Sequence, residues 1–327
     1  MKSRRNINPK EICDQIKKGN IAALSRAITL SESNKDSDQE LANKILGKLK
    51  TKNNDSIRIG ITGVPGAGKS TFIESFGNYL TKLGLKLAVL TIDPSSSVTK
   101  GSILGDKTRM ETLSANKDVF IRPSPASNFQ GGVGKNTRES IFLCESAGYD
   151  IILIETVGVG QNEISVAEMV DFFLLLKISG SGDELQGIKR GIIEMSDLIA
   201  INKCDGNNVE NSIKAKNEFK LALQLFPKKK SNWNPQVLTC SSITGDGLAD
   251  IWDCINDYVS LTKKNNYFYD NRVNQNKSWL LQIIDYSLRK SFFNRKSVKL
   301  KLDNLIKKIE EQKISIFEAS QKILSEI

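Results

Sequence analysis

The chain has 327 residues and a formal net charge of +10, from 47 Lys and Arg against 37 Asp and Glu. This length suffices for one large domain or two ordinary ones with a sizeable hydrophobic core. The sequence contains no histidine, which excludes histidine general bases, imidazole metal sites and histidine-rich tails that store metal.

The positive charge is concentrated at the two ends of the chain. Residues 1–56 carry 12 basic and 7 acidic side chains, residues 261–327 carry 14 and 7, and the middle carries 21 and 23. The motifs described below lie in that nearly neutral middle. The charge therefore fits solvated helix faces or a protein-docking surface better than a nucleic-acid site, and we expect no nucleic-acid partner.

No segment predicts export or a membrane span. The first residues carry positive charge without an apolar run of seven, and the most apolar stretch, DFFLLLKI, is interrupted by Lys177. The five cysteines are odd in number, far apart and without a CxxC pair, as is typical of reduced thiols. We expect a cytoplasmic protein with no membrane partner.

Two helical segments are predicted before the first strand. Asn8, Pro9 and Glu11 fit a helix start with a capping side chain, an N-terminal proline and a capping-box glutamate. Helical spacing then continues through Ile12, Ile16, Ile21, Leu24 and Ile28. A second helix is expected through Leu41, Ile45, Leu46 and Leu49. We assign residues 1–55 to an N-terminal helical extension.

From Ile57 onward, apolar strands alternate with helical stretches. The predicted strands are RIGIT, KLAVLTID, DVFIRP, DIILIET, DFFLLLKI, DLIAINK and QVLTC. This alternation predicts an α/β fold over residues 56–262, with a largely parallel sheet covered by helices on both faces.

The strands stop after about Leu261. A polar link, KKNNYFYDNRVNQNK, precedes three helical stretches with apolar stripes, which are formed by Leu280, Ile283, Ile284 and Leu288, by Leu300, Leu302, Leu305, Ile306 and Ile309, and by Ile316, Ala319, Ile323 and Leu324. Stripes of this size are unfavourable in water. We therefore expect residues 263–327 to form a helical arm that packs on the core or on another subunit.

A glycine-rich turn, GVPGAGKST, follows the first strand and precedes a helix. It matches GxxxxGK[ST], in which backbone N–H groups surround phosphate oxygens, the lysine reaches the terminal phosphates and the serine ligates Mg²⁺. Its position predicts a P-loop NTPase. The nucleotide-binding residues expected from it are Gly63, Val64, Pro65, Gly66, Ala67, Gly68, Lys69, Ser70 and Thr71.

The base is indicated by the NKCD segment at the end of the strand DLIAI. The carboxylate of Asp205 would accept two hydrogen bonds from guanine, whereas adenine would leave it poorly paired. Lys203 would lay its stem along the base, and Asn202 would tie this loop to the P-loop. After the last strand, Ser241 and Ser242 open a loop whose backbone N–H could reach the guanine carbonyl. We therefore expect GTP and GDP as ligands.

Three carboxylates compete for Mg²⁺, with a structural ion pair as the alternative for each. Asp106 lies in GSILGDKTRM, Glu155 closes the strand DIILI, and Asp93 closes KLAVLTI. An acid at a strand end facing the P-loop can hold the metal or its water, and the N–H of Gly158 could reach the γ-phosphate. Together with Ser70, these three acids are the expected metal ligands.

The motifs occur in the order found in one family. GVPGAGKST, DPSS with GSILGDKTRM, FIRPSP with GGV, ETVGVGQNE, SGSGDELQGIKRGI and NKCD follow one another as they do in the MeaB/ArgK-type GTPases of the SIMIBI class. The chain resembles this family over most of its length, including AALSRAITLSES and RVNQNKSWLL. SGSGDELQGIKRGI is the most diagnostic segment, because ordinary GTPases lack it.

This resemblance implies a regulatory cycle. Members are chaperones of adenosylcobalamin-dependent methylmalonyl-CoA mutase, related to the human methylmalonic aciduria type A protein. They bind GTP with Mg²⁺, hydrolyse it slowly alone and faster on the mutase, and gate the loading of cofactor and the removal of inactivated cofactor. Three moving segments carry over, at residues 93–110, 155–161 and 179–192. The family is commonly dimeric through its C-terminal arm, which implies a homodimer.

In the third moving segment, Asp183, Gln186 and Lys189 are placed to exchange ion-pair partners when the client docks. With Lys69, Glu155 and Gly158, they complete the candidate catalytic residues that the resemblance and the motifs indicate. The chain departs from the family at Lys100, where a second glycine is usual, and at SNFQ before GGV. These departures concern switching and partner choice more than nucleotide binding.

Other functions stay open at this point. The client could be isobutyryl-CoA mutase or another cobalamin-dependent acyl-CoA mutase. A kinase linked to lysine, arginine and ornithine transport would need a phosphoacceptor and a base, and the only candidates are carboxylates already assigned to Mg²⁺. A nickel-loading GTPase is disfavoured by the lack of histidine and paired cysteines. An RNA-binding GTPase of the signal-recognition type is disfavoured by the position of the charge.

Overall fold

The computed structural model describes residues 8–49, 55–93, 110–125, 132–156, 163–180 and 190–325. The chain divides into two compact units, Met1–Val273 and Asn274–Ile327. Among the described residues, no helix is long and apolar enough to cross a membrane. The predicted three-part division, with boundaries after residues 55 and 262, stays a prediction.

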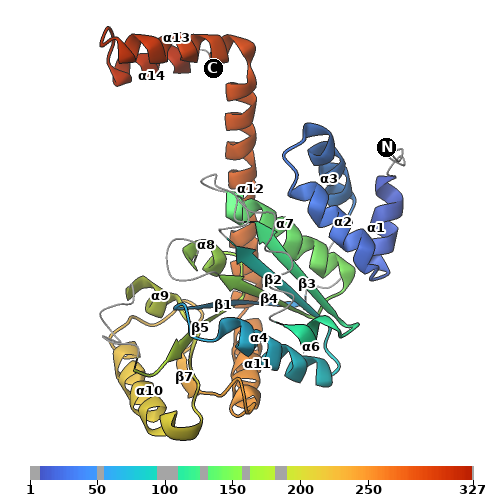
Figure 1. Ribbon diagram of the computed structural model, residues 1–327, viewed down its shortest axis with the longest axis vertical. Coiled ribbons are helices and arrows are strands. Elements are labelled where there is room, and N and C mark those ends of the chain that lie inside the picture. Colours follow the sequence, from blue (N-terminus) through green and yellow to red (C-terminus); the bar gives the residue numbers. More distant parts are fainter. Residues whose placement is uncertain are drawn as a thin grey trace. The chain divides into compact units, whose positions relative to one another are not determined.

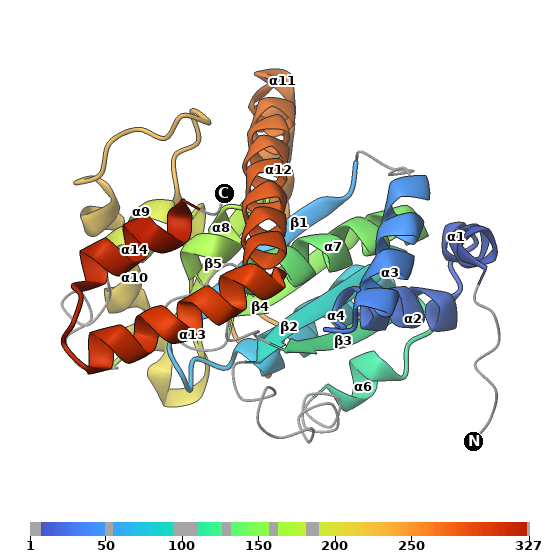
Figure 2. The ribbon, with the colours of Figure 1, turned by 90° about the horizontal axis from the view of Figure 1, so that it is seen from above.

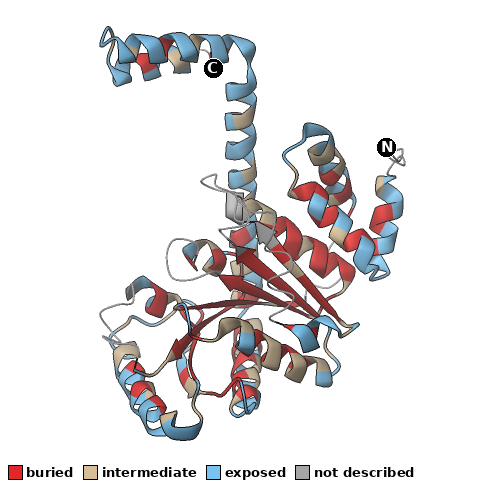
Figure 3. Ribbon diagram, viewed as in Figure 1, coloured by how far each residue is buried: buried red, intermediate tan, exposed pale blue. Residues whose placement is uncertain are grey.

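A sheet of seven parallel strands forms the centre of the first unit, in the order β3-β2-β4-β1-β5-β6-β7 (Figure 1). The strands are β1 Ile57–Gly63, β2 Leu87–Asp93, β3 Val119–Pro125, β4 Ile151–Thr156, β5 Phe172–Ile178, β6 Leu198–Asn202 and β7 Gln236–Thr239. All seven predicted strands and the predicted fold class are confirmed. The strands read as apolar runs because helices bury both faces of the sheet, as Figure 3 shows.

Helices cover each face and form two separate apolar cores. One core contains side chains of α4 (Lys69–Lys82), α6 (Glu111–Ser114) and α11 (Leu248–Lys264). The other contains side chains of the N-terminal helices and of α7 (Gly132–Ala147), α8 (Glu163–Ala167), α9 (Arg190–Met195) and α10 (Val209–Leu223). Successive strand residues alternate between these cores. Ile61 therefore faces α4, and Thr62 faces away from it.

The N-terminal segment forms three helices, α1 (Pro9–Lys17), α2 (Ile21–Ser31) and α3 (Asp36–Lys48), which pack beside α7 (Figure 2). The prediction of unbroken helical spacing as far as Ile28 is wrong at Gly19. That glycine takes a left-handed conformation with φ 77°. The side chain of Asn20 then starts α2 by accepting a hydrogen bond from the N–H of Ala23 at 3.0 Å.

The segment predicted as a polar link is largely helical. α12 runs over Tyr267–Asn294 and is followed by α13 (Lys296–Glu310) and α14 (Ile316–Leu324). The link prediction failed because tertiary contacts hold this polar stretch: the side chain of Phe268 is buried, and the guanidinium of Arg272 lies 4.4 Å from its ring centroid. In the second unit Leu281, Leu300 and Phe317 are exposed.

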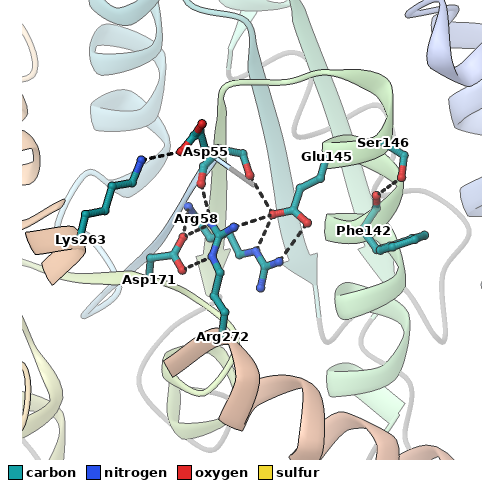
Figure 4. Close-up of polar contacts among 9 residues, drawn as sticks. Asp55, Arg58, Phe142, Glu145, Ser146, Asp171, Lys263 and Arg272 are labelled. Atoms are coloured by element: carbon teal, nitrogen blue, oxygen red, sulfur yellow. Dashed lines mark hydrogen bonds and ion pairs between the residues drawn. The ribbon is translucent and has the colours of Figure 1, made fainter. Parts of the chain in front are cut away.

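Four charged side chains, of which the two carboxylates are buried and the two guanidiniums largely so, form a cluster that includes Arg272 in the part of α12 that belongs to the first unit (Figure 4). Arg272 donates from Nε and Nη2 to the two carboxylate oxygens of Asp171, at 2.8 and 2.6 Å, and from Nη2 to the carbonyl of Ser56 at 2.5 Å. Arg58 donates to both carboxylate oxygens of Glu145, at 2.7 and 2.9 Å. The cluster lies at the amino ends of β1 and β5.

Candidate nucleotide-binding site

The glycine-rich turn leads from β1 directly into α4, and two of its glycines are required by close approach. A Cβ on Gly63 would lie 2.3 Å from the carbonyl oxygen of Leu176. Gly68 precedes α4 with φ 84°, and a Cβ there would lie 2.9 Å from Nδ2 of Asn202. The turn therefore brings the N-terminus of α4 to the carboxyl edge of the sheet, where backbone N–H groups favour an anion.

Lys69 extends back over the turn. Its Nζ donates to the carbonyl oxygens of Gly63 at 2.8 Å and Val64 at 3.3 Å. Burial lowers the pKa of this ammonium, and the carboxylates of Glu155 and Glu163 oppose the shift. A partly dehydrated cation held by loop carbonyls is placed to exchange them for phosphate oxygens.

The predicted metal ligands Ser70 and Glu155 lie together. The hydroxyl of Ser70 donates to Oε1 of Glu155 at 3.2 Å, and the Glu155 side chain is 7% exposed at the end of β4. A hydroxyl and a carboxylate are hard oxygen ligands, and Mg²⁺ is usually held by one or two carboxylates with water and phosphate. This pair therefore fits Mg²⁺, although the described residues contain no group of three or more Asp, Glu, Cys or His that could hold a metal.

Asn202 connects the P-loop to the loop after β7. Its Nδ2 donates to the carbonyl of Ala67 at 2.9 Å, which is the tie that the sequence predicts. Its Oδ1 accepts from the backbone N–H of Ser242 at 3.1 Å and from the Ser242 hydroxyl at 2.8 Å. The Ser242 N–H, a candidate for the guanine carbonyl, therefore bonds within the protein.

Asp205 is oriented by Ser241. The Ser241 hydroxyl donates to Oδ2 of Asp205 at 2.5 Å and accepts from the N–H groups of Ile243 and Thr244 at 3.3 and 3.1 Å. The carboxylate is thus held beside a loop whose own backbone is internally bonded. The side chain of Lys203 lies beside Gly68 of the P-loop: a Cβ built on Gly68 would be 3.9 Å from Cε of Lys203.

The structure places some predicted residues and not others. It brings Lys69, Ser70 and Glu155 together at the end of α4, and it joins the NKCD loop and the Ser241 loop to the P-loop. Five predicted residues lie outside the described part of the chain: Asp106, Gly158, Asp183, Gln186 and Lys189. The side chain of Asp93, at the end of β2, also lies outside it.

Sequence reasoning missed the residue that links α4 to the base-side loop. The hydroxyl of Ser75 donates to the carbonyl of Ser242 at 2.5 Å. Ser75 stands in the second turn of α4, outside every motif, and no local pattern marks it. The contact exists because the fold brings together two residues that are 167 positions apart in the sequence.

These features define a P-loop GTPase: a parallel sheet, a phosphate-binding turn, a Ser-carboxylate pair for a hard cation, and an oriented NKxD aspartate. A family model described as "Methylmalonyl Co-A mutase-associated GTPase MeaB" matches residues 24–297. The chain belongs to this family, and its enzymatic activity is the hydrolysis of GTP.

Individual relatives agree with this assignment. "GTPase ArgK" of Escherichia coli (strain K12) is 46% identical over 266 residues, which are 81% of this chain and 80% of that protein. "Methylmalonic aciduria type A homolog, mitochondrial" of Mus musculus is 41% identical over 94% of this chain and 76% of its own length. A crystal structure of a protein named LAO/AO transport system kinase is 34% identical, with a TM-score of 0.75 over 98% of both chains.

Proposed function

We propose that this GTPase is a chaperone that gates adenosylcobalamin loading, protection and reactivation of methylmalonyl-CoA mutase. One observation carries the proposal. The match to the mutase-associated family spans residues 24–297, so it includes most of α2 and all of α3 before the sheet and α12 after it. A nucleotide pocket alone requires none of these helices. Similarity to the family in these helices therefore supports a partner protein shared with the family, in addition to a shared nucleotide.

The nucleotide would act through the strand ends. Lys69 and Ser70 would contact the terminal phosphates, and Glu155 is the penultimate residue of β4. Bound Mg²⁺ would supply positive charge that stabilises the transferring phosphoryl group. The chain beyond β4, residues 157–162, would then respond to the γ-phosphate. Such a response is the usual way in which a GTPase signals its state to a partner.

We also propose that the chain forms a homodimer through its second unit. Leu280, Leu281, Leu288 and Leu300 are each more than half exposed, as is Phe317. Large apolar side chains exposed in this number on one short helical unit favour a protein interface. Sedimentation equilibrium should give a dimer for the full chain, and a Leu281→Glu, Leu288→Glu variant should be monomeric. A monomeric wild-type chain would contradict the proposal.

The client is tested by mixing purified chain with purified methylmalonyl-CoA mutase. We expect a stable complex and faster GTP turnover than for the chain alone. Lys189→Ala should keep the intrinsic turnover and lose much of the acceleration, because it is assigned to the partner-responsive segment. Isobutyryl-CoA mutase is the parallel sample, and acceleration by that enzyme alone would identify a different client. If no cobalamin-dependent mutase binds or accelerates, the chaperone proposal is wrong.

A second function has one specific observation in its favour. The solved structure that matches 98% of this chain is named a LAO/AO transport system kinase. If this chain acts as such a kinase, γ-labelled nucleotide should transfer its phosphoryl group to a purified lysine-, arginine- or ornithine-binding protein. Transfer that is lost in Lys69→Ala would favour this function. Release of all label as inorganic phosphate would favour the chaperone.

A further inference from the structure

Two threonine hydroxyls meet where β1 and β4 separate. Paired residues of these strands run from Ile57 opposite Ile151 to Ile61 opposite Glu155. Thr62 and Thr156 are the next residue on each strand, and their Oγ1 atoms lie 2.9 Å apart. A hydrogen bond between side chains therefore joins the strands one step beyond their last paired residues.

Each of the two strands stays paired with its other neighbour beyond this point. β1 stays paired with β5 as far as Gly63, and β4 stays paired with β2 as far as Thr156. The P-loop begins at Gly63, one residue after Thr62, and residues 157–162 begin one residue after Thr156. The hydroxyl pair therefore joins β1 and β4 at the carboxyl edge of the sheet, directly before the P-loop.

The bridge lies directly behind the Ser-carboxylate pair. Successive residues of a strand point to opposite faces, so Glu155 faces α4 while Thr156 faces the opposite core. On the α4 side, Glu155 accepts the hydrogen bond from Ser70 at 3.2 Å. The last two residues of β4 are therefore held from both faces. A sideways shift of this strand end would change the distance from Glu155 to Ser70.

Both threonines are 0% exposed. A valine side chain has nearly the same volume as threonine, so packing alone does not require a hydroxyl at either position. A buried hydroxyl without a partner is unfavourable, so a polar pair in an apolar core is tolerated only when its members bond to each other or to the backbone. Oγ1 of Thr156 also lies 3.5 Å from the carbonyl of Ile61. The pair is satisfied, and what it adds over two valines is a directional link between the strands.

We propose that Thr62 and Thr156 are positioning residues for GTP hydrolysis. Their hydrogen bond holds the end of β4, and with it the carboxylate of Glu155, beside the hydroxyl of Ser70, and these are the two groups that would hold Mg²⁺. Neither threonine touches nucleotide or metal. Groups that hydrogen-bond directly to a metal ligand typically contribute about 10–100-fold in metal affinity or activity, and we expect the lower end here because the threonines act through the backbone of β4.

The test uses Thr156→Val and Thr62→Val, which keep the shape and remove the hydroxyl. The affinity for a fluorescent GDP analogue is measured in EDTA and in Mg²⁺, and GTP turnover is measured at saturation. We expect the gain in affinity from Mg²⁺ and the kcat each to fall about tenfold, while the affinity in EDTA changes less than about twofold. Thr156→Ser, which restores a hydroxyl, should recover most of both.

Thr262→Val is the matched control. Thr262 is a buried threonine in α11 whose hydroxyl donates to the carbonyl of Tyr258 at 2.7 Å, far from the nucleotide in sequence and on another element. This variant makes the same chemical change, and it should leave the Mg²⁺ gain and the kcat at the wild-type values. If it lowers them as much as Thr156→Val does, the effect reflects general loosening of the core and the proposal is wrong.

The double variant Thr62→Val, Thr156→Val separates positioning from stability. Thr156→Val leaves the Thr62 hydroxyl without its partner, and Thr62→Val leaves the Thr156 hydroxyl only its 3.5 Å contact with the carbonyl of Ile61. Each single variant should therefore lower the melting temperature, whereas the double variant leaves neither hydroxyl and should regain it. Positioning requires the double variant to remain deficient in Mg²⁺ gain and kcat. If the Mg²⁺ gain and the kcat of the double variant recover together with its melting temperature, the proposal is wrong. If a single variant fails to fold, the double variant alone tests the proposal.

Discussion

Replacing Arg272 with methionine should destabilise the first unit strongly. The guanidinium is 11% exposed, and it makes two hydrogen bonds to Asp171, whose side chain is 2% exposed. Burial lowers the pKa of Arg272, but the carboxylates of Asp171, Glu145 and Asp55 outweigh it, so the pKa is raised and the side chain stays cationic. Removing one partner of a buried pair typically costs about 3–5 kcal/mol, because the remaining charge is left without compensation.

The contacts that survive place the expected loss at the lower end of that range. Asp171 still accepts a hydrogen bond from the N–H of Arg58 at 2.9 Å, and Glu145 keeps both bonds from the Arg58 side chain. We expect the free energy of unfolding to fall by about 3 kcal/mol. For a unit of this size, the melting temperature should fall by about 6–12 °C.

Urea unfolding followed by circular dichroism measures this loss, and Lys263→Met is the control. Lys263 pairs with Asp55 at 2.8 Å on the same edge of the sheet, but the Asp55 side chain is 68% exposed. An exposed pair contributes about 0–1 kcal/mol. Adding Asp171→Asn to Arg272→Met should recover part of the loss, because it removes the stranded carboxylate. A loss below about 1 kcal/mol for Arg272→Met would refute this reasoning.

Three further predictions concern the site and the N-terminal helices. Lys69→Ala should lower GTP turnover by about 100-fold or more, because the phosphate-facing cation is lost; the circular dichroism spectrum should not change, and retained turnover would exclude the assigned role. Asp205→Asn should bind xanthosine nucleotide in place of GTP, with a selectivity change above about 100-fold; competition for a fluorescent GDP analogue measures it, and unchanged affinity for GTP would show that the base assignment is wrong. Burial raises the pKa of Glu139 to about 7, against the opposing charge of Lys135, so the folded state binds this proton more tightly than the unfolded state and stability falls as the pH rises from about 4.5 to 7. Glu139→Gln should remove this part of the pH dependence and be more stable than the wild type at pH 8 by about 3 kcal/mol; equal urea midpoints at pH 5.5 and 8 for the wild type would contradict it.

The strands and the phosphate-binding turn were predictable because their signals are local. A strand buried on both faces needs an uninterrupted apolar run, as in IIL of β4, and the P-loop needs glycines at set positions where the backbone turns close to other groups. The NKCD segment is a local signal too, since one short segment carries both the carboxylate that we assign to the base and Asn202, which reaches the P-loop at Ala67.

Local patterns failed where distant contacts decided the outcome. The polar stretch before Asn274 reads as a link, yet it is helical because Phe268 is buried and Arg272 bonds to Asp171, 101 positions away. Gly19 interrupts a spacing that looks continuous, and in this case the glycine followed by Asn20 was a visible signal. Nothing in the sequence around Ser75 indicates its bond to Ser242.

The sequence by itself determined the fold class, the phosphate-binding turn and the preference for guanine, because each depends on residue types at short, fixed spacings. The tertiary structure decided how Glu155 is held. Its contact with Ser70 spans 85 positions, and the hydroxyl pair of Thr62 and Thr156 behind it spans 94. A threonine at a strand end reads like a valine in a pattern of apolar residues. Only the pairing order of the strands shows that these two hydroxyls meet at the carboxyl edge of the sheet, beside the P-loop.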